Sequence, residues 1–217
     1  MTWARKNSIG FVWFVIFIFI APSISPAWNT MTNVYSDLIF YLGITAIVIV
    51  QDRMILVNGA WRSLKKRRTW VAVLLTILGL GFAYGVASLL ISLFPHANVG
   101  WAKLSVHGWV GLVAFGLSTI ILPPIAEELF FRKSIIVLNS SKWMLILTTL
   151  ISVIIFGLEH SLYPLGFLEG AFIGIAFAIP YILTRNIMVT IMAHFLTNLL
   201  MNGESIIVVI NHLSRLH

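Results

Sequence analysis

Residues 109–138 read WVGLVAFGLSTIILPPIAEELFFRKSIIVL, and this stretch decides the class of fold. At 1.5 Å per residue it would form a helix about 45 Å long, which exceeds the roughly 30 Å hydrocarbon core of a bilayer. The pair Pro123-Pro124 in its middle is expected to break or kink that helix. Charged side chains follow directly, beginning with Glu127 and Glu128. Such residues inside an apolar segment mark a candidate functional site in a membrane protein.

The composition of the whole chain agrees with a membrane protein. Of its 217 residues 59% are hydrophobic and only 10% are charged, against about 45 to 50% and about 25% in ordinary soluble domains. This excludes a soluble enzyme, a disordered chain and a fibrous repeat. With no cysteine, the chain has no disulfide, thiolate metal site or thiol nucleophile. We predict one all-α, polytopic transmembrane helical bundle that forms a single integral-membrane domain over residues 1–217.

The apolar stretches predict about seven to eight membrane helices. They lie at about 9–28, 37–56, 70–94, 109–138, 143–160, 165–183 and 187–201, followed by a short segment 205–213 that crosses partly or lies at the surface.

The basic residues predict the orientation of the bundle. The net charge is +7, but the cations lie between apolar stretches, so membrane lipid is favoured over nucleic acid as their partner. Arg53 and the cations of the loop Arg62 to Arg68 are typical of a cytoplasmic connection next to anionic lipid. With Arg5 and Lys6 on the same side, the amino terminus is predicted to be cytoplasmic.

Polar residues on three separate segments are predicted to converge at membrane depth. Counted from the inner turns, Glu127 and Asn198 lie about 20 Å into their helices, His194 about 14 Å and His160 about 27 Å. Lipid would penalise these groups unless they faced each other or a wet cavity. A carboxylate and an imidazole can activate water, while a second imidazole and an amide can donate hydrogen bonds to an oxyanion. The chemistry indicated is hydrolysis.

Helical spacing groups the neighbouring residues on common faces. Glu128 and Arg132 are four residues apart and are expected to form an ion pair. Phe156 and His160 share a face in the same way, whereas Glu127 is turned about 100° from Glu128 and points elsewhere.

Three strings in this order resemble the motifs of a known family. Residues 127–132 (EELFFR), 156–160 (FGLEH) and 194–198 (HFLTN) resemble the EExxxR, FxxxH and HxxxN motifs of the CPBP family, also called the Abi family, of CAAX proteases and bacteriocin-processing intramembrane proteases. The resemblance covers residues 121–202. It implies a multi-pass hydrolase that cleaves a peptide or a membrane-associated substrate.

The resemblance also implies a role for each matched residue. Glu127 and His160 would activate the attacking water, and His194 and Asn198 would hold the oxyanion. The residues Glu128, Arg132 and Phe156 would support them. No cofactor is required in such a glutamate mechanism, although the family has been labelled metalloprotease and two histidines make zinc possible.

Two alternatives stay open at this point. Ser118 follows Gly116-Leu117 and would be the nucleophile of a serine intramembrane protease, which leaves Glu127 without a role. A noncatalytic protein, such as a bacteriocin-immunity factor, a peptide-binding protein or a proton-coupled carrier, would use the same carboxylates without turnover. The short chain looks bacterial, which favours the plasma membrane and an unmodified peptide substrate over a prenylated one.

Overall fold

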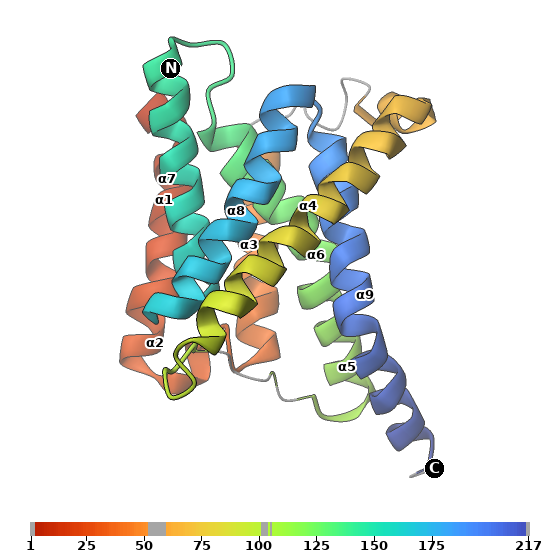
Figure 1. Ribbon diagram of the computed structural model, residues 1–217. Helices are drawn as coiled ribbons and strands as arrows, with labels where there is room; N and C mark the ends of the chain where they lie inside the picture. The colour runs from red at the N-terminus through yellow and green to blue at the C-terminus, as the bar shows by residue number, and fades with distance from the viewer. Residues whose placement is uncertain (1–2, 52–59, 101–103, 105, 216–217) are drawn as a thin grey trace. The chain divides into compact units, whose positions relative to one another are not determined.

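The computed structural model describes residues 3–51, 60–100, 104 and 106–215, and almost all of them are helical (Figure 1). Arg53 and Lys103 lie outside the described residues. In chain order the elements are α1 (Trp3–Val15), η1 (Ile16–Ile20), α2 (Ala21–Ile24), η2 (Pro26–Trp28), α3 (Val34–Gln51), η3 (Ala60–Lys65), α4 (Arg67–Ser92), α5 (Gly108–Gly116), η4 (Leu117–Ile121), α6 (Leu122–Glu127), η5 (Glu128–Ile135), α7 (Lys142–His160), α8 (Pro164–Thr184) and α9 (Ile187–Ser214).

Among the described residues, six helices are long and apolar enough to cross a membrane, and Val34–Val50 of α3 is a shorter apolar helix. The prediction of a polytopic helical bundle is therefore confirmed. Large apolar side chains face outward on these helices, for example Leu78 and Phe82 of α4. A soluble protein would bury such side chains, but in a bilayer they contact lipid.

The chain forms two compact units, each assembled from segments that are distant in sequence. The first unit comprises Met1–Asp52, Ala102–Glu127 and His194–His217, and the second unit comprises Arg53–Trp101 and Glu128–Ala193.

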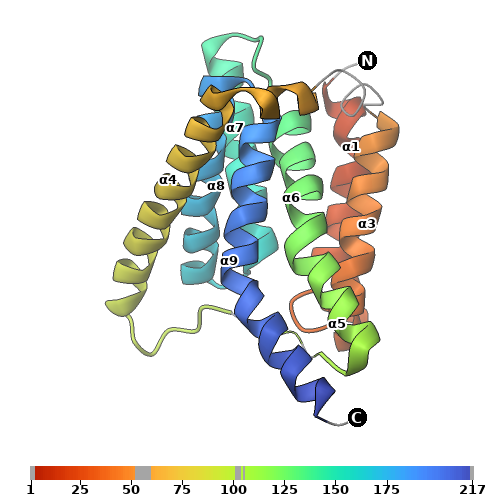
Figure 2. The same ribbon diagram turned by 90° about the vertical axis from the view of Figure 1, so that its right-hand side faces the viewer.

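In the first unit, α3 packs against α1 and against the α5 to α6 segment (Figure 2). Trp13 fixes the α1 contact, because its indole Nε1 donates to the Phe40 carbonyl at 3.1 Å. Its ring occupies the space that a side chain at Gly43 would need, so only glycine permits this approach. Phe115 of α5 lies in an apolar cluster with Val34 of α3.

In the second unit, α8 packs against both α4 and α7 (Figure 1). A Cβ added at Gly170 of α8 would lie 3.0 Å from the Cα of Gly157 in α7. The Gly170 and Gly174 spacing thus permits a close helix contact. Gly81 and Gly85 of α4 have the same spacing, but a Cβ at either would meet open space.

The sequence predicted a break or a kink at the proline pair, and the structure shows no break. Residues Gly108–Ile135 run as one helical segment, in which α6 is flanked by the π-helical segments η4 and η5. Pro123 and Pro124 lie in α6 and carry no N–H. Wider π-type turns are a known way for a helix to absorb such missing hydrogen bonds.

The predicted short terminal segment is also corrected. Residues 205–213 do not form a separate element but continue α9, which extends from Ile187 to Ser214. Its 28 residues span about 42 Å, longer than the roughly 30 Å hydrocarbon core. The polar residues Asn202 and Glu204 lie inside this helix without interrupting it.

Candidate active site

Glu127 is the last residue of α6 and is buried in the first unit, with 3% of its surface exposed. The Tyr41 hydroxyl, from α3, donates to its Oε1 at 2.8 Å. His194 lies on the other side, with Nε2 3.9 Å from Oε2. The described contacts of this carboxylate are therefore a phenol and an imidazole. Neither group carries a permanent positive charge that would pair with the carboxylate.

His194 belongs to α9 and is also buried. The 3.9 Å separation from Glu127 is too long for a direct hydrogen bond but short enough for a strong electrostatic interaction in a medium of low dielectric constant. An imidazole N–H can donate a hydrogen bond to a developing negative charge.

Asn198 lies one turn beyond His194, and the proline pair explains its position. Its Nδ2 donates to the carbonyl of Thr119 at 2.9 Å. That carbonyl would bond the N–H of residue 123 in an α-helix or of residue 124 in a π-helix, and both residues are prolines. The prolines thus release a carbonyl that holds the Asn198 amide, while the second N–H of the amide can serve a ligand.

Two residues near Glu127 were missed by sequence reasoning. Tyr41 and Asp37 are four residues apart on α3, so they share a face. Asp37 is buried and lies close enough to Glu127 for their charges to interact. The available signal was an acidic residue inside an apolar segment, four positions before a tyrosine.

Ser118, the alternative nucleophile, lies on η4 and is buried. Its neighbour is the carboxyl of Asp37. Activation of a serine needs a basic partner within hydrogen-bond reach, most often an imidazole or an amine. A carboxyl neighbour alone does not meet this requirement, so this environment does not favour the serine mechanism.

The second unit contains the predicted supporting residues. Glu128 and Arg132 form the expected ion pair, with Oε1 and Nη1 3.3 Å apart and both side chains fully buried. The Arg132 guanidinium lies 4.2 Å from the ring centre of Phe156 and 5.0 Å from that of Phe177. Its Nη2 also donates to the carbonyl of Gly174 at 3.3 Å. Arg132 therefore ties η5 to α7 and α8.

His160 ends α7 and stacks on Phe156, with ring centres 4.3 Å apart. Its Nδ1 lies 2.9 Å from the Phe156 carbonyl. Because a carbonyl only accepts hydrogen bonds, this contact assigns the proton to Nδ1 and the lone pair of the neutral ring to Nε2. The His160 side chain is 37% exposed, and its Nδ1 also lies 4.0 Å from Oε2 of Glu159.

The structure thus brings Glu127 to His194, and His160 to Phe156 and the carbonyl of that residue. Glu127, His194 and Asn198 belong to the first unit, whereas His160 belongs to the second. The pairing of Glu127 with His160 stays a prediction.

Within the described residues, no group of three or more His, Cys, Asp or Glu side chains is arranged to hold a metal ion. A catalytic zinc site normally has three protein ligands, and Glu127 with His194 supplies two candidate ligands in the first unit. The zinc alternative stays a prediction.

The structure is that of a polytopic helical bundle in which a buried carboxylate (Glu127) and a buried imidazole (His194) lie close together, with a half-buried amide (Asn198) one turn further along α9. Residues 109–200 match the family model described as "Type II CAAX prenyl endopeptidase Rce1-like". This match confirms, over less than half of the chain, the resemblance to the CPBP family that the three motifs predicted. The match supports a CAAX-type intramembrane protease at the level of the family. No curated protein and no solved structure matches the chain.

Proposed function

We propose that this protein is an intramembrane endopeptidase in which Glu127 is the general base. The observation that carries the proposal is a buried glutamate held by a tyrosine hydroxyl and a histidine, within a segment that matches a CAAX endopeptidase family. A carboxylate in such a place is energetically costly, and function is the usual reason for it.

In the proposed reaction, Glu127 and His160 remove a proton from water as its oxygen attacks the peptide carbonyl carbon. The carbonyl π-electrons move to oxygen, and the resulting oxyanion accepts hydrogen bonds from His194 and Asn198. The intermediate collapses and the carbon–nitrogen bond breaks. Glu127 and His160 return the proton to the leaving amine. The products are a carboxylic acid and an amine, and no redox partner is needed.

The ion pair of Glu128 and Arg132 is proposed to hold the helix that continues from Glu127. The Phe156 ring supports this pair by stacking on the Arg132 guanidinium. The same ring also stacks on the His160 imidazole and is proposed to position it. Glu128, Arg132 and Phe156 are thus proposed to be positioning residues, which do not touch the substrate themselves.

The proposed substrate is a peptide, or the exposed end of a membrane protein. The family description names a prenyl endopeptidase, so a farnesylated CAAX peptide is the first candidate, with its unprenylated form as the comparison. We also propose a bacterial plasma membrane and a cytoplasmic amino terminus, on the basis of the cationic loop Arg62 to Arg68.

The test uses the purified full chain in lipid vesicles with both peptides. Glu127→Gln and His160→Ala are expected to reduce cleavage by about 10² to 10⁴-fold, the usual contribution of a general base. Matched controls are Glu204→Gln and His212→Ala, two exposed residues of α9. Cleavage that survives both active-site changes would exclude the proposed base.

The same assay distinguishes the alternatives. Because the proposed mechanism uses no metal, a zinc chelator is expected to leave cleavage unchanged, and loss that is restored by zinc would establish the metalloprotease. A wild-type chain that binds a peptide but never cleaves one would instead establish the noncatalytic function.

A further inference from the structure

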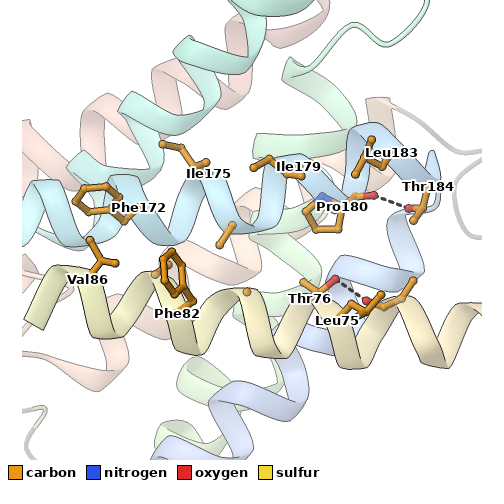
Figure 3. Close-up of a pocket in the computed structure, with 14 residues that line it drawn as sticks. Leu75, Thr76, Phe82, Val86, Phe172, Ile175, Ile179, Pro180, Leu183 and Thr184 are labelled. Atoms are coloured by element: carbon orange, nitrogen blue, oxygen red, sulfur yellow. Dashed lines mark hydrogen bonds between the residues drawn. The ribbon is translucent and has the colours of Figure 1, made fainter.

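A groove with a volume of about 470 Å³ lies between α4 and α8 of the second unit. Figure 3 shows apolar side chains of both helices along it. Several are well exposed, including Leu75, Phe82, Ile175, Ile179 and Leu183. Both helices are candidate membrane spans, so the groove opens to hydrocarbon.

Two threonines line the groove, but their hydroxyl donors are directed to their own helices. Thr76 donates to the Ala72 carbonyl at 2.7 Å, and Thr184 donates to the Pro180 carbonyl at 2.6 Å (Figure 3). The groove therefore offers an apolar surface without a free hydroxyl donor from these residues. Such a surface favours a hydrocarbon chain over a polar peptide.

The groove is long enough for most of an acyl chain. On α4 its lining extends from Ala72 to Val86, which corresponds to about 21 Å of helix. One leaflet occupies half of the roughly 30 Å hydrocarbon core, or about 15 Å, and the groove is longer than that.

One end of the groove carries positive charge. Arg67 and Arg68 begin α4, four to five residues before Ala72, and Arg185 directly follows Thr184 at the end of α8. The Ser63 hydroxyl donates to Asn186 Oδ1 at 3.3 Å, which holds the loop that precedes α4 next to the end of α8. The basic residues of this loop and of both helix ends are all exposed: Arg62, Lys65, Lys66, Arg67, Arg68 and Arg185.

This charge has no exposed acidic counterpart in the described part of the second unit. The acids described there are Glu128, Glu159 and Glu169, and all three are buried. Arg185 donates from Nη1 to Asn139 at 3.0 Å, which fixes the side chain while other guanidinium donors can bind an anion.

We propose that this groove is a binding site for one anionic phospholipid, whose acyl chain lies between α4 and α8 and whose phosphate contacts the cations at the groove end. The charge complementarity selects an anionic headgroup over a zwitterionic one, since each nearby Lys or Arg strengthens binding to anionic lipid several-fold. The site is independent of the proposed protease activity.

The experiment titrates the purified full chain in detergent with phosphatidylglycerol or phosphatidylcholine, and counts bound lipids by native mass spectrometry. We expect one retained phosphatidylglycerol per chain and about tenfold weaker retention of phosphatidylcholine. Inorganic phosphate alone is expected not to displace the lipid. Equal retention of both lipids, or displacement by phosphate, would overturn the proposal.

A filling substitution tests the groove itself. Gly79 lines the groove and a Cβ there meets open space, so Gly79→Phe is expected to abolish retention of the lipid. Gly81→Phe is the matched control, because Gly81 has equal space on the same helix but lies outside the groove lining. Ala176→Leu on α8 fills the groove from the opposite wall and provides a second variant. Full retention by folded filling variants would overturn the proposal.

A charge substitution tests the headgroup contact. Arg67→Gln combined with Arg68→Gln is expected to remove the preference for phosphatidylglycerol, a change of about tenfold. Lys142→Gln on α7 removes a charge away from the groove lining and should retain the preference. A preference that persists without both arginines would contradict the assigned headgroup site.

Discussion

Glu127 and Glu128 are neighbours in sequence, but their surroundings differ. Glu128 is fully buried beside the guanidinium of Arg132, which itself stacks on Phe156 and Phe177. Glu127 is also buried, but its described contacts are the Tyr41 hydroxyl and the His194 imidazole.

In the proposed mechanism, this difference separates a structural carboxylate, Glu128, from a reactive one, Glu127. Arg132 carries a permanent charge, so proton uptake by Glu128 would leave a buried cation without its counterion. Tyr41 and His194 carry no permanent charge, so they impose no such penalty. We therefore propose that Glu127 exchanges a proton during the reaction, whereas Glu128 holds η5 in place.

The largest effect is expected for Glu128→Gln. This substitution leaves Arg132 buried without its charge partner, which should lower the free energy of unfolding by about 3 to 5 kcal/mol. Unfolding of the purified protein in mixed micelles measures the change. A Glu128→Gln protein that stays stable but loses activity would contradict a purely structural role for Glu128.

Replacing both partners of the ion pair provides the control. Glu128→Leu with Arg132→Met removes the two charges together, so most of the lost stability should return. If the double variant were as unstable as Glu128→Gln, shape rather than uncompensated charge would explain the effect.

The next effect is expected for Asn198→Ala, which removes an amide assigned to the oxyanion. Cleavage should fall by about 10²-fold, or about 3 kcal/mol, with little change in substrate affinity. Asn211→Ala changes an exposed residue of the same helix in the same way and should cleave normally. A loss confined to affinity would assign Asn198 to substrate binding.

A smaller effect is expected for Tyr41→Phe. The substitution removes the hydroxyl that orients Glu127 at 2.8 Å, which should lower kcat about tenfold. Tyr35→Phe, on the same helix and 49% exposed, is the matched control. Unchanged kcat in the Tyr41 variant would show that Glu127 is oriented by other contacts.

The smallest effect is expected for Pro123→Ala. The new backbone N–H would compete with Asn198 for the Thr119 carbonyl, and kcat should fall about threefold. Pro180→Ala restores a backbone donor inside α8 of the second unit and should leave kcat unchanged. An unchanged kcat in the Pro123→Ala variant would mean that the Thr119 carbonyl is not needed to position the Asn198 amide.

The sequence predicted those features that depend on local pattern. The spans followed from length and hydropathy, and the Glu128 to Arg132 pair followed from a spacing of four residues. The continuous α9 did not follow, because Asn202 and Glu204 interrupt the hydropathy without interrupting the helix.

The contact of Tyr41 with Glu127 could not be predicted in the same way. The two residues are 86 positions apart, and Tyr41 belongs to no motif. The partnership of Asn198 with Thr119 joins residues 79 positions apart and depends on a carbonyl that two prolines release. Contacts of this kind arise from tertiary packing, which no local pattern encodes.

The π-helical segments that flank α6 carry a consequence for the evolution of this helix. A π-type turn corresponds to one additional residue in an α-helix, so deletion of a single residue within Leu117–Ile121 would restore regular winding. That deletion would rotate every preceding residue by about 100° relative to Glu127, and Ser118 and Thr119 would change their neighbours while the hydrophobicity of the span stayed the same. In this helix, the register of the chain is therefore under stronger constraint than its composition, and relatives are expected to tolerate many apolar exchanges here but no insertion or deletion.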